Sequence, residues 1–170
     1  MARSRTRAPS STTTQIVRVN GARVRITTRN GKVTTKPAPP LEWELQAAQV
    51  AALRRLLSFQ KRFLLAGDMN SAKRGPRAQA QAIATGMTSG EPDLRIYGEN
   101  GRLLLIENKV GNGRLSPAQK DRHAALERLG YTVLVIRATT TTEAAELAVI
   151  AVQDWLDAQR YDKDVAHHAA

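Results

Sequence analysis

The stretch that most constrains the fold lies at residues 86–109, where two short apolar runs flank a turn. The runs cover 94–97 and 103–106, and glycine and polar residues separate them. Apolar runs on either side of such residues predict a β-hairpin. A three-residue loop at 99–101 suits the sequence, because Gly101 can take the left-handed conformation that this kind of loop requires.

This register gathers charged residues at one end of the hairpin. Counting back from the loop places Asp93 opposite Glu107, and directly opposed side chains share a face at roughly 5 Å. Lys109 projects from that same face, because it lies two residues beyond Glu107. Opposed carboxylates repel, and a divalent cation such as Mg²⁺ would offset the repulsion. The alternatives are a solvated strand end at which Lys109 neutralises Glu107, or a two-residue turn that moves Glu107 to the other face.

A series of motifs surrounds these charges. In chain order it consists of Gly86, Gly90, Pro92-Asp93-Leu94, Ile106-Glu107-Asn108-Lys109, Gly113-Arg114-Leu115-Ser116-Pro117, Gln119 and Gly130. The series resembles the VRR-NUC family of PD-(D/E)XK nucleases, especially its small stand-alone members from phages and bacteria, over about residues 42–137. Asn108 stands where many relatives carry an apolar residue, and its side chain is expected to point away from the site.

The resemblance implies an endonuclease that hydrolyses DNA phosphodiester bonds with Mg²⁺ or Mn²⁺. Duplex, branched and nicked DNA all stay open as its substrate. It implies that Asp93, Glu107 and the Asn108 carbonyl bind the metal, together with an acidic residue early in the first core helix. Glu42 matches that residue best and Glu44 is the runner-up, although acids in a first helical turn are also ordinary dipole partners. Lys109 would position the attacking water. The alternative function is a nucleic-acid-binding protein that does not cleave.

Further polar residues are candidates for catalysis or substrate contact. Ser116, Pro117 and Gln119 fit a helix N-cap, a first-turn proline and a capping-box residue, so capping alone explains Gln119, whereas the resemblance makes it a site residue. His123 is expected to lie on a polar helix face and to be structural. The basic loop before the 77–85 helix, and that helix itself, supply candidate nucleic-acid contacts, although a plain turn is equally consistent: Asn70, Lys73, Arg74 and Arg77.

Positive charge is concentrated at the beginning of the chain. The net charge of +11 favours a polyanionic partner such as DNA. Residues 1–40 hold nine of the 26 basic residues and no acidic residue, which leaves 17 basic and 15 acidic residues for the remainder. Asn-Gly pairs at 20–21 and 30–31 separate alternating runs, so a three-stranded meander is predicted. Alternation gives it one apolar and one basic face, and we expect nucleic-acid contacts from Arg18, Arg23 and Arg25; the alternative is a solvated extension.

We expect an α/β fold with a restriction-endonuclease-like mixed central sheet flanked by helices. The expected segments are a disordered tail (1–13), the meander and a Pro-rich linker (14–40), the nuclease-like core with a C-terminal helix (41–160), and a frayed tail (161–170). The first core strand is predicted at 62–65, and apolar spacing predicts the buried stripes of two helices. These stripes are Leu41, Leu45, Ala48, Ala52, Leu53, Leu56 and Leu57 in the first, and Leu147, Ile150, Ala151 and Trp155 in the last.

The chain has no cysteine, which agrees with a reducing cytoplasm of a bacterial or phage-infected cell. No apolar run approaches the ~20 residues that span a membrane, and no apolar segment of a secretory signal follows the first arginines. The resemblance implies a homodimer, for which the meander and the helix that carries Trp155 offer apolar surface.

Overall fold

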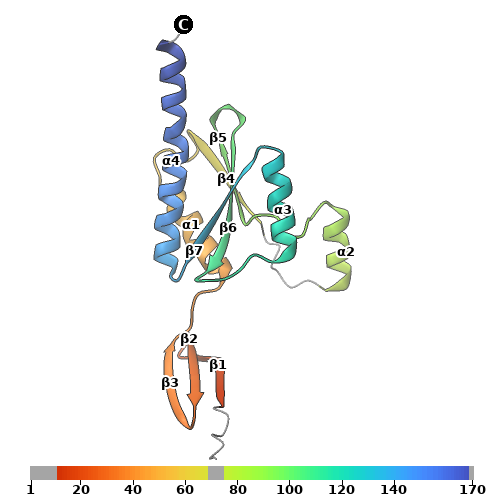
Figure 1. Cartoon of the computed structure of the whole chain (residues 1–170), viewed down its shortest axis with the longest axis vertical. Coiled ribbons are helices and arrows are strands. Elements are labelled where there is room, and N and C mark those ends of the chain that lie inside the picture. Colours follow the sequence, from red (N-terminus) through yellow and green to blue (C-terminus); the bar gives the residue numbers. More distant parts are fainter. Residues whose placement is uncertain (1–10, 69–74, 169–170) are drawn as a thin grey trace, which may run out of the picture. The chain divides into compact units, whose positions relative to one another are not determined.

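The computed structural model describes residues 11–68 and 75–168, with side chains described as far as residue 158. The chain divides into two compact units, Met1–Pro39 and Pro40–Ala170. The fold is mixed α/β: an antiparallel three-stranded meander forms the first unit, and a mixed four-stranded sheet packed with helices forms the second (Figure 1).

The meander consists of β1 (Thr12–Val19), β2 (Ala22–Arg29) and β3 (Lys32–Pro37) in that order. Both predicted Asn-Gly turns are present, with positive φ at each residue: 49° and 81° at 20–21, and 50° and 77° at 30–31. Positive φ at both central residues is what tight hairpin turns need, and asparagine and glycine tolerate it best. Strand β3 runs to Pro37, so the first residue of the Pro-rich linker expected at 37–40 belongs to the sheet.

The second unit contains a sheet of strand order β4-β5-β6-β7. Its elements are α1 (Glu42–Leu53), β4 (Phe63–Gly67), α2 (Pro76–Ala84), β5 (Leu94–Gly98), the short 3-10 turn η1 (Glu99–Gly101), β6 (Leu103–Val110), α3 (Pro117–Arg128), β7 (Thr132–Ala138) and α4 (Thr141–His168). Strands β4, β5 and β6 pair antiparallel, whereas β6 and β7 pair parallel, with α3 as the crossover. The first core strand therefore begins one residue later than predicted and continues to Gly67.

The hydrophobic core lies between one face of the sheet and helices α1 and α4 (Figure 1). Ile96, Ile106 and Ile136 from three strands pack there against Leu53 of α1 and Val152 of α4. Helix α3 lies on the opposite face and contacts β7. Helices α1 and α4 therefore pack on one face of the sheet and α3 on the other. Successive side chains along β6 alternate between these two faces.

Two predicted stripes need correction. In α1 the buried residues are Leu45, Gln49 and Leu53, whereas Leu57 lies beyond the end of the helix and is 88% exposed. In α4 the buried positions are Ala144, Ala148, Val152 and Leu156, while the predicted Leu147 and Ile150 are exposed. The α4 stripe is rotated because this helix packs on α1, and close helix contact favours alanine over larger side chains.

Helix α4 also continues to His168, beyond the predicted end at Arg160. Trp155 packs within the unit, since its ring lies 4.5 Å from the guanidinium of Arg102 and its edge is close to Gly98. No described helix is both long and apolar enough to cross a membrane.

Candidate active site

The hairpin has the register that the sequence predicts. The loop covers 99–101, Gly101 has φ 72°, and the Gly98 N–H donates to the Arg102 carbonyl at 2.9 Å. Leu94 pairs with Ile106 as the last partners of β5 and β6. Asp93 therefore precedes β5 beside Glu107, and its Oδ2 accepts a hydrogen bond from the Asn108 N–H at 2.7 Å.

Lys109 lies at the centre of the charged cluster. Its Nζ donates to Glu107 Oε1 at 2.7 Å, to the Asn108 carbonyl at 2.9 Å and to Glu42 Oε1 at 3.1 Å. The side chains of Glu107 and Lys109 are only 1% and 4% exposed, whereas that of Glu42 is 45% exposed. The structure thus brings Glu42 from the first turn of α1 to the residues of β6. The runner-up Glu44 instead accepts from the Leu41 N–H at 2.7 Å as a helix cap.

The electrostatics of the cluster follow from burial. Burial raises the pKa of Asp93 to about 6 from its ordinary 3.8, and the negative charge of Glu107 adds to the shift. Burial also raises the pKa of Glu107, against the hydrogen bond and charge of Lys109. For Lys109, burial lowers the pKa, but the hydrogen bonds and charges of Glu107 and Glu42 outweigh it and raise the pKa. Lys109 is therefore an ammonium group that donates hydrogen bonds.

Gln119 serves the helix cap and the cluster at once. Ser116 Oγ accepts from the Gln119 N–H at 3.2 Å, and Gln119 Oε1 accepts from the Ser116 N–H at 2.9 Å, which is the predicted capping box. The remaining donor of the amide, Nε2, points to Glu107 Oε1 at 2.5 Å. The two readings of Gln119 are compatible, because capping uses its oxygen and the carboxylate uses its nitrogen.

His123 belongs to the cluster, contrary to the prediction of a polar helix face. It is buried at 5% exposure, and its Nε2 lies 3.5 Å from Glu107 Oε2. Neither of these two atoms has a hydrogen-bond partner in the described part of the chain. Burial lowers the pKa of His123. The sequence signal was its spacing: four residues after Gln119 on one helix places it on the same face.

Two glutamines of α1 hold the strands that carry the site. Gln46 Nε2 donates to the main-chain carbonyls of Asp93 at 2.9 Å and Asp68 at 3.2 Å. Gln49 Nε2 donates to Asn108 Oδ1 at 2.7 Å, and both side chains are buried. The side chain of Asn108 therefore points away from the charged cluster, as predicted, while its carbonyl faces Lys109. The glutamines follow Glu42 at helical spacing, which was the available signal for them.

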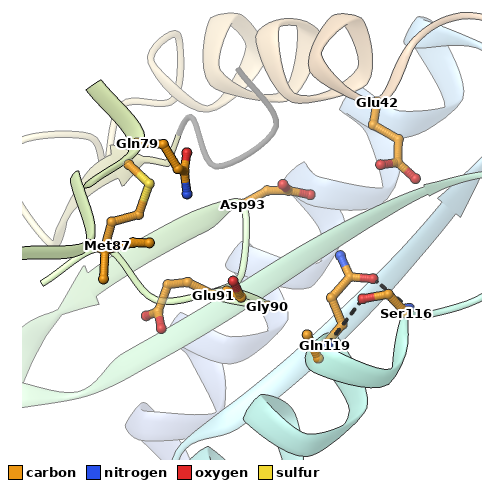
Figure 2. A pocket seen from close by; sticks show the side chains of 11 residues that line it. Glu42, Gln79, Met87, Gly90, Glu91, Asp93, Ser116 and Gln119 are labelled. Atoms are coloured by element: carbon orange, nitrogen blue, oxygen red, sulfur yellow. Dashed lines mark hydrogen bonds between the residues drawn. The ribbon is translucent and has the colours of Figure 1, made fainter. Parts of the chain in front are cut away.

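An open pocket of about 270 Å³ lies beside the cluster. Figure 2 shows Glu42, Asp93 and Gln119 around it, with Gln79 and Met87 from the α2 side. Gly90 lines it where the loop approaches α3 closely: a Cβ on Gly90 would lie 2.3 Å from the Ala118 carbonyl oxygen, and its φ is 82°. A side chain at residue 90 would clash with α3, which explains why the motif has glycine at this position.

A series of connected ion pairs stabilises the wall of the pocket. The carboxylate of Glu91 accepts from Arg122 of α3 at 2.7 Å and from Arg95 of β5 at 3.0 Å. Arg95 also pairs with Asp68 at 3.0 Å. These contacts connect the end of β4, strand β5 and helix α3 around the Asp93 loop.

The residues predicted to contact nucleic acid lie in three separate parts of the chain. Arg77 is exposed in the first turn of α2. Asn70, Lys73 and Arg74 lie outside the described residues. The three meander candidates, Arg18, Arg23 and Arg25, belong to the other compact unit.

The donor set fits a divalent cation in part. Carboxylate and carbonyl oxygens are the ligands that Mg²⁺ prefers, and the buried Glu107 Oε2 has no hydrogen-bond partner. The Lys109 ammonium, however, already donates to three of the expected donors, Glu107 Oε1, the Asn108 carbonyl and Glu42 Oε1, whereas Asp93 accepts from the Asn108 N–H. Within the residues that the structure describes, no group of three or more His, Asp or Glu side chains is arranged to hold a metal. A metal would therefore have to share these oxygens with Lys109.

Neither a protein-family model nor a curated protein matches the sequence. Among solved structures, a "VRR_NUC domain protein" is similar with a TM-score of 0.48 and 22% identity, over 71% of this chain and 91% of that one. A second, described as "VRR_NUC domain", has a TM-score of 0.39 and 19% identity, over 61% of this chain and 92% of that one. The chain thus resembles VRR_NUC domain proteins in structure over most of its length, at a distance that leaves its function to be argued from the site.

Proposed function

We propose that the chain is a metal-dependent endonuclease that hydrolyses phosphodiester bonds of DNA. The observation that carries the proposal is the convergence of Asp93, Glu107, Lys109 and Glu42 beside an open pocket. Well-packed apolar residues in place of a buried ion pair are often equally or more stable. The buried pair of Glu107 and Lys109 is therefore poorly explained by stability alone, and its position beside a pocket supports a chemical role.

In this proposal Asp93, Glu107 and the Asn108 carbonyl hold a Mg²⁺ or Mn²⁺ ion, and Glu42 joins them directly or through water. The ion would supply positive charge for the attacked phosphate and lower the pKa of a bound water. Gln119 fixes the Glu107 carboxylate through its hydrogen bond to Oε1, and the buried His123 Nε2 lies 3.5 Å from Oε2.

Lys109 would orient the attacking water and stabilise negative charge on the phosphate. An ammonium has three donors, and Glu107, Asn108 and Glu42 accept all three. To reach water or phosphate, Lys109 has to release one of them. Glu42 has the longest contact and is the most exposed of the three, so we expect the Glu42 contact to exchange first.

The substrate test compares linear, nicked and four-way-junction DNA, each with Mg²⁺, with Mn²⁺ and with a chelator. Cleavage that requires the metal, on any of these substrates, agrees with the proposal, and the relative rates identify the preferred DNA structure. Absence of cleavage from all three substrates with both metals contradicts it.

A second candidate function has a specific observation in its favour. The observation is that the Lys109 ammonium donates to three of the oxygens proposed to bind the metal, and the candidate function is that of a nucleic-acid-binding protein that does not cleave. Stable binding of DNA without cleavage in the same assays would favour this reading.

We also propose that the chain forms a homodimer. Val19 and Val33 on the apolar face of the meander are 49% and 60% exposed, and Ile150 of α4 is 54% exposed. Trp155 does not contribute, since it packs against Arg102 within its own unit. Light scattering should give twice the 18.6 kDa of one chain; a single-chain mass at micromolar concentration contradicts the dimer.

A further inference from the structure

The strands of the meander separate charge onto one face. In a paired sheet, directly opposed residues share a face. The register opposes Arg18 to Arg23, Arg25 to Lys36 and Arg29 to Lys32. Thr27 lies on the same face between Arg25 and Arg29 of β2, and it opposes Thr14 and Thr34. We call these six arginines and lysines the basic face; the other face carries Val17, Val19, Val24, Ile26, Val33 and Pro37.

No negative charge compensates the basic face within its own segment, because the first acidic residue of the chain is Glu42. Arg18 and Arg23 donate to the carbonyls of Gly21 and Pro39 at 3.0 and 2.9 Å, so both help to shape the hairpins. The side chains of the other four residues are exposed and make no hydrogen bond or ion pair in the described part of the chain: Arg25, Arg29, Lys32 and Lys36.

This arrangement has an energetic cost. Like charges directly opposed on neighbouring strands are destabilising, and the basic face has three such pairs. A three-stranded sheet has little stability to spare. A polyanion laid against the face would reverse the sign of this contribution, because each cation would then contact a negative group.

The width of the sheet decides what the face can contact. Neighbouring strands lie about 4.8 Å apart, so the outer strands of the meander are roughly 10 Å apart before side chains are added. The major groove of DNA is about 12 Å wide and admits a two-stranded ribbon. Three strands with long arginine and lysine side chains are too wide for it. The face can therefore contact phosphates on either side of a groove more readily than base edges.

We propose that the basic face binds the phosphodiester backbone of duplex DNA without regard to sequence. The choice of DNA as the polyanion rests on the proposed function, whereas the binding surface does not. The Pro-rich segment at 37–40 connects this surface to the unit that carries the candidate active site.

The test uses the full-length chain with four substitutions, Arg25→Gln, Arg29→Gln, Lys32→Gln and Lys36→Gln. Affinity for a fluorescent duplex is measured by anisotropy in chelator, from 50 to 200 mM salt. Each phosphate contact contributes about −0.9 to the slope of log affinity against log salt. Loss of four contacts should reduce the slope by roughly 3–4, so the salt-induced loss of affinity over this range becomes roughly 100-fold smaller. Two duplexes of unrelated sequence should behave alike.

Two matched variants isolate the face from charge in general. The first removes four exposed charges from the other unit, Arg54→Gln, Arg55→Gln, Lys61→Gln and Arg128→Gln, and should change the slope much less. The second keeps the charge of the face while changing its residues, Arg25→Lys, Arg29→Lys, Lys32→Arg and Lys36→Arg, and should keep the slope of the wild type. An equal loss of slope in the first variant, or an unchanged slope in the four-glutamine variant, overturns the inference.

A separate variant tests the proposed nuclease function. Glu107→Gln should stop cleavage and leave the salt slope unchanged. If the wild type does not cleave but its slope depends on the basic face, the nuclease proposal fails and the binding surface stands. If the wild type cleaves but its salt slope does not depend on the basic face, the nuclease proposal stands and the proposed binding surface fails.

Discussion

The candidate active site and the meander use charge in opposite ways. In the site, Glu107 and Lys109 are buried, paired and held by α1 and α3 in one geometry. On the meander, three pairs of like charges oppose one another at the surface. Short, fixed contacts suit the chemistry of a single bond, whereas exposed like charges act at the longer range that gathers a polyanion. Substitutions at the buried pair and on the meander should therefore have separate effects.

The largest effect is expected at the buried pair. Lys109→Met should lower cleavage by about 10²–10³-fold, because in the proposed mechanism it removes the donor for the charge that develops on the phosphate. It should also destabilise the fold by about 3–5 kcal/mol, since Glu107 is left buried without its partner. Chemical denaturation and single-turnover cleavage measure the two effects.

The matched double variant, Glu107→Gln with Lys109→Met, removes both charges. It should recover most of the lost stability and none of the activity. Recovery of cleavage in the double variant would show that the pair is structural only.

Asp93→Asn should stabilise the chain in the absence of metal. The folded-state pKa of about 6 lies above the ordinary 3.8, so the stability associated with the protonated carboxyl is complete below pH 3.8 and is lost as pH rises through 6. Above that pH, ionised Asp93 costs the folded state on the order of 3 kcal/mol. In chelator, the variant should therefore be more stable than the wild type at pH 7.5 and equal to it near pH 3.5.

If Asp93 binds the ion as proposed, Mg²⁺ should bind the wild type more tightly than the variant and should reduce or reverse that difference in stability. Calorimetry should then show weaker Mg²⁺ binding to the variant. Equal stability of the two proteins at pH 7.5 in chelator would mean that ionised Asp93, buried beside Glu107, does not destabilise the folded state.

Gln119 allows the cap and the site to be separated. Gln119→Ala should cost about 1 kcal/mol through loss of the capping box and should also slow cleavage. Gln119→Glu keeps an acceptor for the Ser116 N–H but cannot donate to Glu107. Thermal unfolding measures the stability of both variants, and cleavage rates measure their activity. Full activity of Gln119→Glu would mean that Gln119 acts only as a helix cap.

The smallest effect is expected on the meander. Removing the charge of Lys32 and Lys36 relieves repulsion across two opposed pairs, worth about 0.2–1 kcal/mol each. Amide hydrogen exchange in β2 and β3 should therefore slow by a few-fold in Lys32→Gln with Lys36→Gln. Added duplex DNA should slow exchange in the wild type more than in the variant. Faster exchange in the variant contradicts the idea that the charges are held at a cost.

The parts of the molecule that sequence predicted well are those specified by neighbouring residues. The hairpin register depends on the loop at Gly101, the meander on two Asn-Gly turns, and the start of α3 on Ser116 and Gln119. Each of these is a local backbone requirement that a few residue types satisfy. Because the register followed from the loop, the juxtaposition of Asp93 with Glu107 and Lys109 also followed.

The parts that sequence missed depend on packing between distant elements. Polar residues such as Gln49 and His123 are buried only because α1 and α3 cover opposite faces of β6. In α4, hydrophobicity favoured Leu147 and Ile150, whereas close packing on α1 placed Ala144 and Ala148 inside. Residue type alone does not state which helix will lie against which face.

The proposed metal-dependent nuclease is tested most directly by a Mg²⁺ titration of cleavage, with the wild type and Glu107→Gln measured side by side. Gln keeps the size of residue 107 and removes the charge that contacts Lys109, Gln119 and His123. We expect cleavage by the wild type to rise with Mg²⁺ and to stop with chelator. We expect no cleavage by a Glu107→Gln protein that still folds and still binds DNA. Cleavage by Glu107→Gln at the wild-type rate, or wild-type cleavage that persists in chelator, would contradict the proposed function.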